Sequence, residues 1–194
     1  MGLVLENWLA NILSQAFGAG IGFWLAPGLI LAAGLLLAYK SGEYKHFSLK
    51  KTFLTTEAFW FFGLMVLFTA IGRGLPIFDD FQNLPTVSMM AAGNVPPQFA
   101  LNPDVSFGYH YFQLLVSAQL VRIGGLFPAI SLDITKAFFL VLSGLLAGKF
   151  IFRVTSRRLS EGLGVIFIFL SSGARWLFFF MPEKFQSALN IQIQ

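Results

Sequence analysis

NWLANILSQAFGAGIGFWLAPGLILAAGLLLAY, residues 7–39, contains no charged residue and decides the class of fold. A helix needs roughly 20 residues to cross a bilayer, because the hydrocarbon core is about 30 Å thick and each residue rises about 1.5 Å. The stretch exceeds that length and is interrupted by Gly18, Gly20, Gly22 and Pro27. We therefore expect an interfacial or tilted first helix, followed by a membrane-spanning helix from about Gly20 to Tyr39.

The composition of the whole chain is typical of an integral membrane protein. Of its 194 residues, 56% are hydrophobic and 11% are charged, and the mean hydropathy is +0.73; about a quarter of residues are charged in an average soluble protein. The absence of cysteine excludes a disulfide framework and a thiolate metal site. The first residues lack the basic start and the small-residue cleavage site of a signal peptide, so we expect them to be retained.

Further apolar runs predict an all-α fold: a polytopic membrane helical bundle of about four to five transmembrane helices in a single transmembrane domain, residues 1–194. Backbone groups cannot remain unpaired in lipid, so each run should be helical. The predicted segments are the first helices 3–39, a cytoplasmic loop 40–51, a helix 52–72, an outer acidic loop with a juxtamembrane helix 73–104, and helices 105–125, 134–152 and 162–181.

The basic residues set the expected orientation rather than indicating nucleic-acid binding. Residues 40–51 carry four lysines against one acidic residue, so this segment should be cytoplasmic and the acidic loop should lie outside. The three arginines at 153–158 should also be cytoplasmic, which demands an odd number of crossings after the loop. Two apolar runs lie in between. Either the run 105–121 is re-entrant or partial, or the arginines lie outside.

The outer loop, RGLPIFDDFQNLPTVSMMAAGNVPPQFALNPD, is the candidate functional region. It holds five of the eight prolines together with several Phe and Met residues. Such apolar residues are unusual in an exposed loop, and they favour packing of the loop on the membrane surface. Residues 85–92 are expected to form a short juxtamembrane helix that Gly93 and Asn94 end. The adjacent carboxylates Asp79 and Asp80 could supply a divalent-cation ligand or a base toward an acceptor hydroxyl; the alternative is a helix N-cap or an ordinary turn.

A polar stripe is predicted on the apolar run that follows the loop. Ser106, His110, Gln113 and Ser117 fall at i, i+4, i+7 and i+11, within about 60° of one another on a helix. Inside a membrane such a stripe must face other protein or a water-filled cavity. It either forms hydrogen bonds across helices or lines a cavity. Two GxxxG motifs, at 18–22 and 144–148, permit close approach of helices.

The order of these features resembles a known family. An apolar helix and a loop with an acidic pair near its start are followed by a Pro-Pro segment and an aromatic helix entry, PPQFALNPDVSFGYHYFQLLVSAQLVRIGG, and then by a helix ending in KFIFRVTSRRLSEG. Over residues 53–182 this resembles the N-terminal part of the GT-C membrane glycosyltransferases, such as protein O-mannosyltransferases and the transferases that add aminoarabinose to lipid A.

The resemblance implies transfer of a sugar from a polyprenyl-phosphate donor to an acceptor on the outer face of the plasma (inner) membrane. Asp79 or Asp80 would match the acidic motif of the first loop, as catalytic base or as ligand of Mg²⁺ or Mn²⁺. The residues expected to contact substrate are Tyr109, His110, Tyr111, Gln113 and Arg175, the last of which alternatively snorkels to the interface. The family often has a second acidic motif in a later outer loop and many more helices, whereas this chain offers only Glu183 there. The missing second motif and the small number of helices are expected of a fragment of such an enzyme, a split member of the family, or a scaffold without full catalytic competence.

Two other classes of function remain open. One is a non-catalytic small integral membrane subunit of a larger complex, in which a membrane protein partner supplies further helices. The other is a small transporter or lipid-handling protein that uses the polar stripe. In all three cases the lipid bilayer is the surrounding partner.

Overall fold

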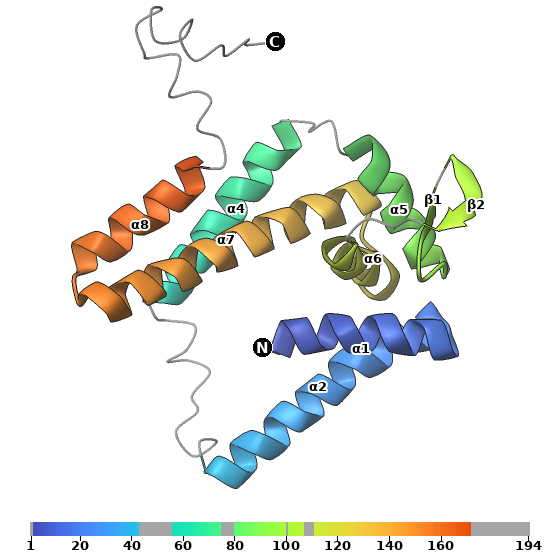
Figure 1. Ribbon diagram of the computed structural model, residues 1–194, viewed down its shortest axis with the longest axis horizontal. Coiled ribbons are helices and arrows are strands. Elements are labelled where there is room, and N and C mark those ends of the chain that lie inside the picture. The colour runs from blue at the N-terminus through green and yellow to red at the C-terminus, as the bar shows by residue number, and fades with distance from the viewer. Residues whose placement is uncertain (1, 43–55, 75–79, 100, 107–110, 172–194) are drawn as a thin grey trace, which may run out of the picture. The chain divides into compact units, whose positions relative to one another are not determined.

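The computed structural model describes residues 2–42, 56–74, 80–99, 101–106 and 111–171 (Figure 1). Its elements are α1 Gly2–Phe17, α2 Ala19–Ser41, α4 Thr56–Gly74, α5 Asp80–Ala92, β1 Gln98–Phe99, β2 Asn102–Ser106, α6 Phe112–Gly124, α7 Pro128–Thr155 and α8 Arg158–Ser171. The predicted, predominantly helical class is confirmed. The chain divides into two compact units, Met1–Phe139 and Leu140–Gln194, and the predicted single transmembrane domain stays a prediction.

Helices α1 and α2 form an antiparallel hairpin in the first unit. The single residue between them, Gly18, has φ +83°, a left-handed conformation that glycine adopts without steric cost. A Cβ at Gly22 would overlap the backbone nitrogen and Cα of Ser14, and one at Gly2 would lie 3.8 Å from Cγ2 of Ile30. The two helices therefore pack along the whole of α1. The predicted break between an initial helix and a longer apolar helix is confirmed.

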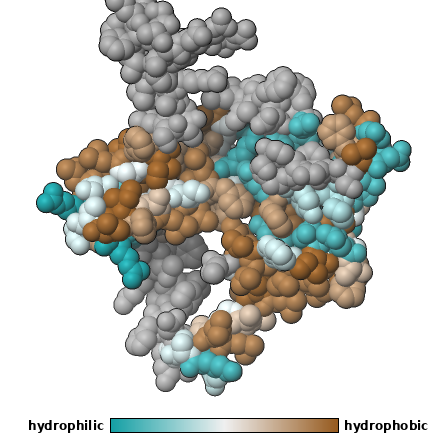
Figure 2. Space-filling model, in the orientation of Figure 1, coloured by the Kyte–Doolittle hydropathy of each residue, from teal (hydrophilic) through white to brown (hydrophobic). Residues whose placement is uncertain are grey.

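The second half of α2 extends away from this contact. Leu35, Leu36 and Leu37 are 62%, 62% and 69% exposed. Residues 31–37 are all exposed, and seven consecutive residues, about 100° apart, point to every side of a helix, so the described protein packs against no side of this part of α2. Soluble monomers rarely leave so much continuous apolar surface uncovered. Figure 2 shows apolar surface along several of the helices, and α2 is the plainest case.

Helix α4 packs antiparallel on the first part of α7. The rings of Phe61 and Phe138 meet edge to face with centroids 5.9 Å apart. Near the other end of α4, a Cβ at Gly72 would lie 3.7 Å from Oδ1 of Asp133. The helix predicted at 52–72 is observed from residue 56 to 74, and the one predicted at 134–152 starts six residues earlier.

The helix predicted at 105–125 is wrong at residues 105, 106 and 111, and residues 107–110 lie outside the described part of the chain. Residues 102–106 form strand β2, which pairs antiparallel with β1 through Gln98 opposite Ser106 and Phe99 opposite Asn102. Helix α6 starts at Phe112. The sequence VSFGY at 105–109 is apolar enough to enter a hydropathy window, but it is made of β-branched, aromatic, serine and glycine residues that favour helices weakly. Hydropathy therefore overestimated the helix.

In the second unit the end of α7 and helix α8 form a second hairpin. Their contact depends on glycine: a Cβ at Gly144 would overlap the ring of Phe169, and one at Gly148 would overlap Cγ2 of Val165. The GxxxG motif at 144–148 thus allows the close approach predicted for it. Helix α8 starts at Arg158, four residues before the predicted start, and the predicted residues 172–181 lie outside the described part of the chain.

Two of the described helices, α2 with 23 residues and α7 with 28, are long and apolar enough to cross a membrane. Helices α1, α6 and α8 have 16, 13 and 14 described residues, fewer than the roughly 20 that a span requires. The number of four to five spans stays a prediction.

Candidate functional site

Part of the predicted acidic loop forms a helix, α5. Helix α5 begins at Asp80 and ends at Ala92, where the N–H groups of Gly93 and Asn94 donate to the carbonyl of Met89 at 3.1 and 3.0 Å. The expected end of the juxtamembrane helix is confirmed, and its start lies five residues earlier than predicted. A helix N-terminus favours acidic residues because its free N–H groups carry partial positive charge, which is consistent with an aspartate at the first position.

Buried apolar side chains fix α5 against neighbouring helices. The buried members of this core include Phe23 and Ala26 of α2, Val87, Met90 and Ala91 of α5, and Leu114, Leu115 and Ala118 of α6. Such close-packed interiors transmit small changes of position. Helix α5 is thereby held in a defined position relative to α6, the helix that follows the aromatic entry.

Of the predicted substrate-contacting residues, Tyr111 and Gln113 are described. Tyr111 precedes the first residue of α6, and its hydroxyl donates to Oδ1 of Asn11 in α1 at 2.8 Å. Gln113 is exposed on α6. Asp79, Tyr109, His110 and Arg175 lie outside the described residues, as does the side chain of Asp80, so their predicted roles stay predictions.

The polar stripe does not exist as one helical face. Ser106 belongs to strand β2, while Gln113 and Ser117 belong to α6. Ser117 is fully buried and its carbonyl accepts a hydrogen bond of 2.6 Å from the hydroxyl of Ser131 in α7, whereas Gln113 is exposed. The hydroxyl of Ser117 itself donates to the carbonyl of Gln113 in the same helix at 3.5 Å, so the bond between α6 and α7 involves the Ser117 backbone and not the predicted side chain.

A polar contact between α1 and α6 was not predicted. Nε2 of Gln119 donates to the Glu6 carboxylate at 2.6 Å, which adds to the bond between Tyr111 and Asn11. Nε2 of Gln15 also donates to Oδ1 of Asn11, at 3.1 Å. The α1 partners Glu6 and Asn11 are five residues apart, about 140° around a helix, so their polar type and not their spacing was the signal available in the sequence.

Burial changes the acidity of two groups in this contact. Desolvation raises the pKa of the Glu6 carboxyl, and the hydrogen bond from Gln119 opposes that rise. Burial likewise raises the pKa of the Tyr111 hydroxyl, opposed by its bond to Asn11. The neutral tyrosine is therefore favoured, which keeps its O–H available to donate to α1.

Arg122 joins three helices next to the end of α5. Its guanidinium donates to the carbonyl of Ala91 in the last turn of that helix, where a cation also complements the partial negative charge of the helix end. A Cβ at Gly20 of α2 would lie 3.1 Å from its Nη2 atom. The arginine thus holds the end of α5 beside the start of α2.

A metal centre is not apparent in the part of the chain that is described. No group of three or more His, Cys, Asp or Glu side chains gathers there. The predicted cation ligand Asp79 falls outside that part. A divalent cation at the acidic pair therefore stays a prediction.

Comparison of the chain with protein-family models, with curated proteins and with solved structures finds no match. The fold and the candidate site define only a class: a predominantly helical protein with two described helices long and apolar enough to cross a membrane and a packed helix, α5, that begins at an aspartate.

Proposed function

We propose that this chain is a multi-pass plasma (inner) membrane protein that carries the first-loop part of a GT-C-type glycosyltransferase. It transfers a sugar from a polyprenyl-phosphate donor to an acceptor on the outer face. Asp79 and Asp80 provide the base or hold a divalent cation, and the aromatic residues 109–111 lie beside the donor phosphate. Arg175 contributes positive charge to that phosphate.

The observation that carries the proposal is the position of Asp80. It is the first residue of α5, the next described element after the apolar helix α4, and α5 packs on α6, which starts just after the aromatic entry. The helix that starts at Asp80 is thereby in contact with the helix that follows the aromatic entry. An acidic pair and an aromatic entry that belong to one site need this kind of support, because catalytic groups must be held in a fixed geometry.

The length of α6 favours the orientation that this function needs. Its 13 residues extend about 20 Å, too short for a core of about 30 Å. Helix α7, with 28 residues, then makes the single crossing between the outer loop and the arginines at 153–158. One crossing is an odd number, so the arginines and the lysines at 40–51 are both cytoplasmic, and the acidic loop lies outside.

Single cysteines test this orientation, since the chain has none of its own. Asn94→Cys, in an exposed position after α5, should react with a membrane-impermeant maleimide on intact cells. Ser41→Cys, at the end of α2, should react only after permeabilisation. The reverse pattern would place the acidic loop on the cytoplasmic side and remove access to an outer-face acceptor.

Transfer itself is tested with the full chain in membranes. Polyprenyl-phosphate donors carrying radiolabelled mannose, arabinose or aminoarabinose are added, and label in membrane protein and in lipid A is compared with membranes that lack the chain. We expect label above the control with at least one donor. Incorporation equal to the control with all three donors contradicts the proposal and favours the non-catalytic subunit.

A further inference from the structure

The turn between α7 and α8, in the second unit, concentrates positive charge. Its cations are Lys149, Arg153, Arg157 and Arg158, and its single acidic residue is Glu161. Four cations and one anion give residues 149–161 a formal charge of +3, out of +4 for the whole chain. Most of the net charge of the protein therefore lies in one short segment.

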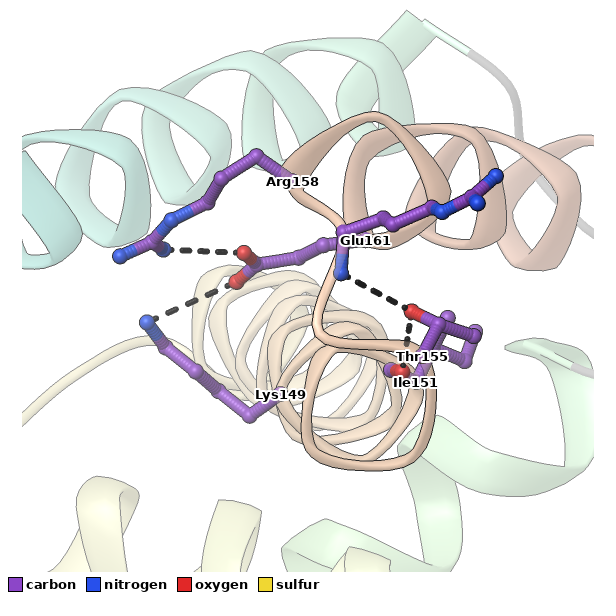
Figure 3. Close-up of polar contacts among 6 residues, drawn as sticks. Lys149, Ile151, Thr155, Arg158 and Glu161 are labelled. Atoms are coloured by element: carbon purple, nitrogen blue, oxygen red, sulfur yellow. Dashed lines mark hydrogen bonds and ion pairs between the residues drawn. The ribbon is translucent and has the colours of Figure 1, made fainter.

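One carboxylate is shared between two of the cations (Figure 3). Oε2 of Glu161 lies 3.0 Å from Nη1 of Arg158, and Oε1 lies 3.5 Å from Nζ of Lys149. A single negative charge balances only one of the two positive charges. The guanidinium of Arg158 also lies 4.4 Å from the ring centroid of Phe152, a cation–π contact that holds it near the helix surface.

The other two cations point into open space. The side chains of Arg153 and Arg157 are exposed, and neither forms an ion pair with any residue of the described ranges. They flank a turn whose backbone is fixed by two hydrogen bonds: Ser156 N–H donates to the carbonyl of Phe152 at 2.7 Å, and Arg157 N–H donates to Oγ1 of Thr155 at 3.3 Å. A defined turn thus presents them together.

Apolar side chains surround the same turn. Phe150, Val154 and Leu159 are 68%, 69% and 75% exposed, and exposed apolar residues continue along α8 through Leu163 and Phe167. Exposed hydrocarbon that ends in a row of arginines is the arrangement expected where a helical hairpin leaves the bilayer, with its cations at the level of the headgroups.

We infer that the α7–α8 turn binds the headgroups of anionic phospholipids at one face of the membrane. Its occupant is a lipid surface, because the cations and the exposed hydrocarbon adjoin one another and a phospholipid complements both. Each cation close to such a surface strengthens the attraction on the order of fivefold. This lipid contact does not depend on the proposed glycosyltransferase activity.

The test measures which lipids the purified full chain retains. The chain is placed in mixed micelles with equal amounts of phosphatidylglycerol and phosphatidylcholine of identical acyl chains, and bound lipid is counted by native mass spectrometry. We expect the wild type to prefer phosphatidylglycerol by about tenfold or more. Arg153→Gln/Arg157→Gln removes two exposed cations that have no side-chain ion pair, and should bring the preference below about threefold.

Two further variants and one competitor sharpen the result. Lys50→Gln/Lys51→Gln removes the same charge elsewhere and should keep the preference. Glu161→Gln removes the negative charge beside Lys149 and Arg158 and should increase the preference several-fold. Equal retention of both lipids by the wild type, or an equal loss in the lysine variant, overturns the inference. Displacement of phosphatidylglycerol by inorganic phosphate at the same concentration would also overturn it, because it would indicate a small-anion site.

Discussion

Asp79→Asn and Asp80→Asn should each lower sugar transfer by about a hundredfold or more. A general base contributes typically 10² to 10⁴ to the rate, and asparagine has the shape of aspartate without its basicity or its negative charge. Asparagine is also accepted at the start of a helix, so α5 should still form from position 80. The loss should therefore appear in turnover and leave membrane insertion unchanged.

The measurement is the radiolabel transfer assay, normalised to the amount of chain in the membrane. Asp104→Asn is the matched control, because this substitution makes the same change in charge at an exposed residue of β2. Chelation distinguishes a cation ligand from a catalytic base. If the acidic pair holds a cation, EDTA should abolish wild-type transfer, and added Mg²⁺ or Mn²⁺ should restore it. If the acidic pair acts only as a base, EDTA should have no effect on transfer. Transfer within threefold of wild type in both variants would remove the acidic pair from the mechanism.

Hydropathy predicted the helices of this chain because each long apolar run must satisfy its own backbone. Helices α2, α4 and α7 all lie within a few residues of the predicted ranges. The approach failed at residues 105 and 106, which belong to β2, where pairing with β1 provides the backbone partners instead. Apolarity and conformational preference are separate properties, and a run of Val, Phe, Gly and Tyr has the first without favouring a helix.

The site was less accessible to sequence reasoning than the fold. The contact between Tyr111 and Asn11 joins residues 100 positions apart, and no local pattern specifies such a partner. Its α1 side was visible as Glu6, Asn11 and neighbouring polar residues within an apolar segment, yet their partners depend on how α6 lies against α1. The acidic pair was found from its residue type, while the position of Asp80 at the start of α5 required the structure.

Gly22→Ala should destabilise the α1–α2 hairpin by about 1–3 kcal/mol, the usual cost of overpacking a close contact. The added Cβ would overlap the backbone nitrogen and Cα of Ser14, and helix backbone cannot move aside as the end of a side chain can. The two helices must then separate. Separation also weakens the contacts of α1 with α6, which include the bond from Tyr111 to Asn11.

Three variants distinguish this clash from a general effect of alanine. Gly28→Ala, on the same helix, meets nothing within 4 Å and should be neutral or slightly stabilising, since alanine favours a helix more than glycine. In Gly20→Ala the three nearest atoms to the added Cβ belong to the guanidinium of Arg122, the end of a flexible side chain that can shift, so this variant should be less destabilised than Gly22→Ala. Ser14→Ala should not rescue Gly22→Ala, because the backbone atoms of residue 14 remain in place.

Thermal unfolding in detergent, followed by tryptophan fluorescence, measures the difference, since Trp8 and Trp24 lie on these two helices. A chain of this size loses roughly 2–4 °C of Tm per kcal/mol, so Gly22→Ala should unfold about 2–12 °C below the wild type. Gly28→Ala should unfold at or above it. If Gly22→Ala and Gly28→Ala unfold at the same temperature, α1 does not pack on α2 at Gly22, and the support that α1 gives to Tyr111 at the candidate site is lost with it.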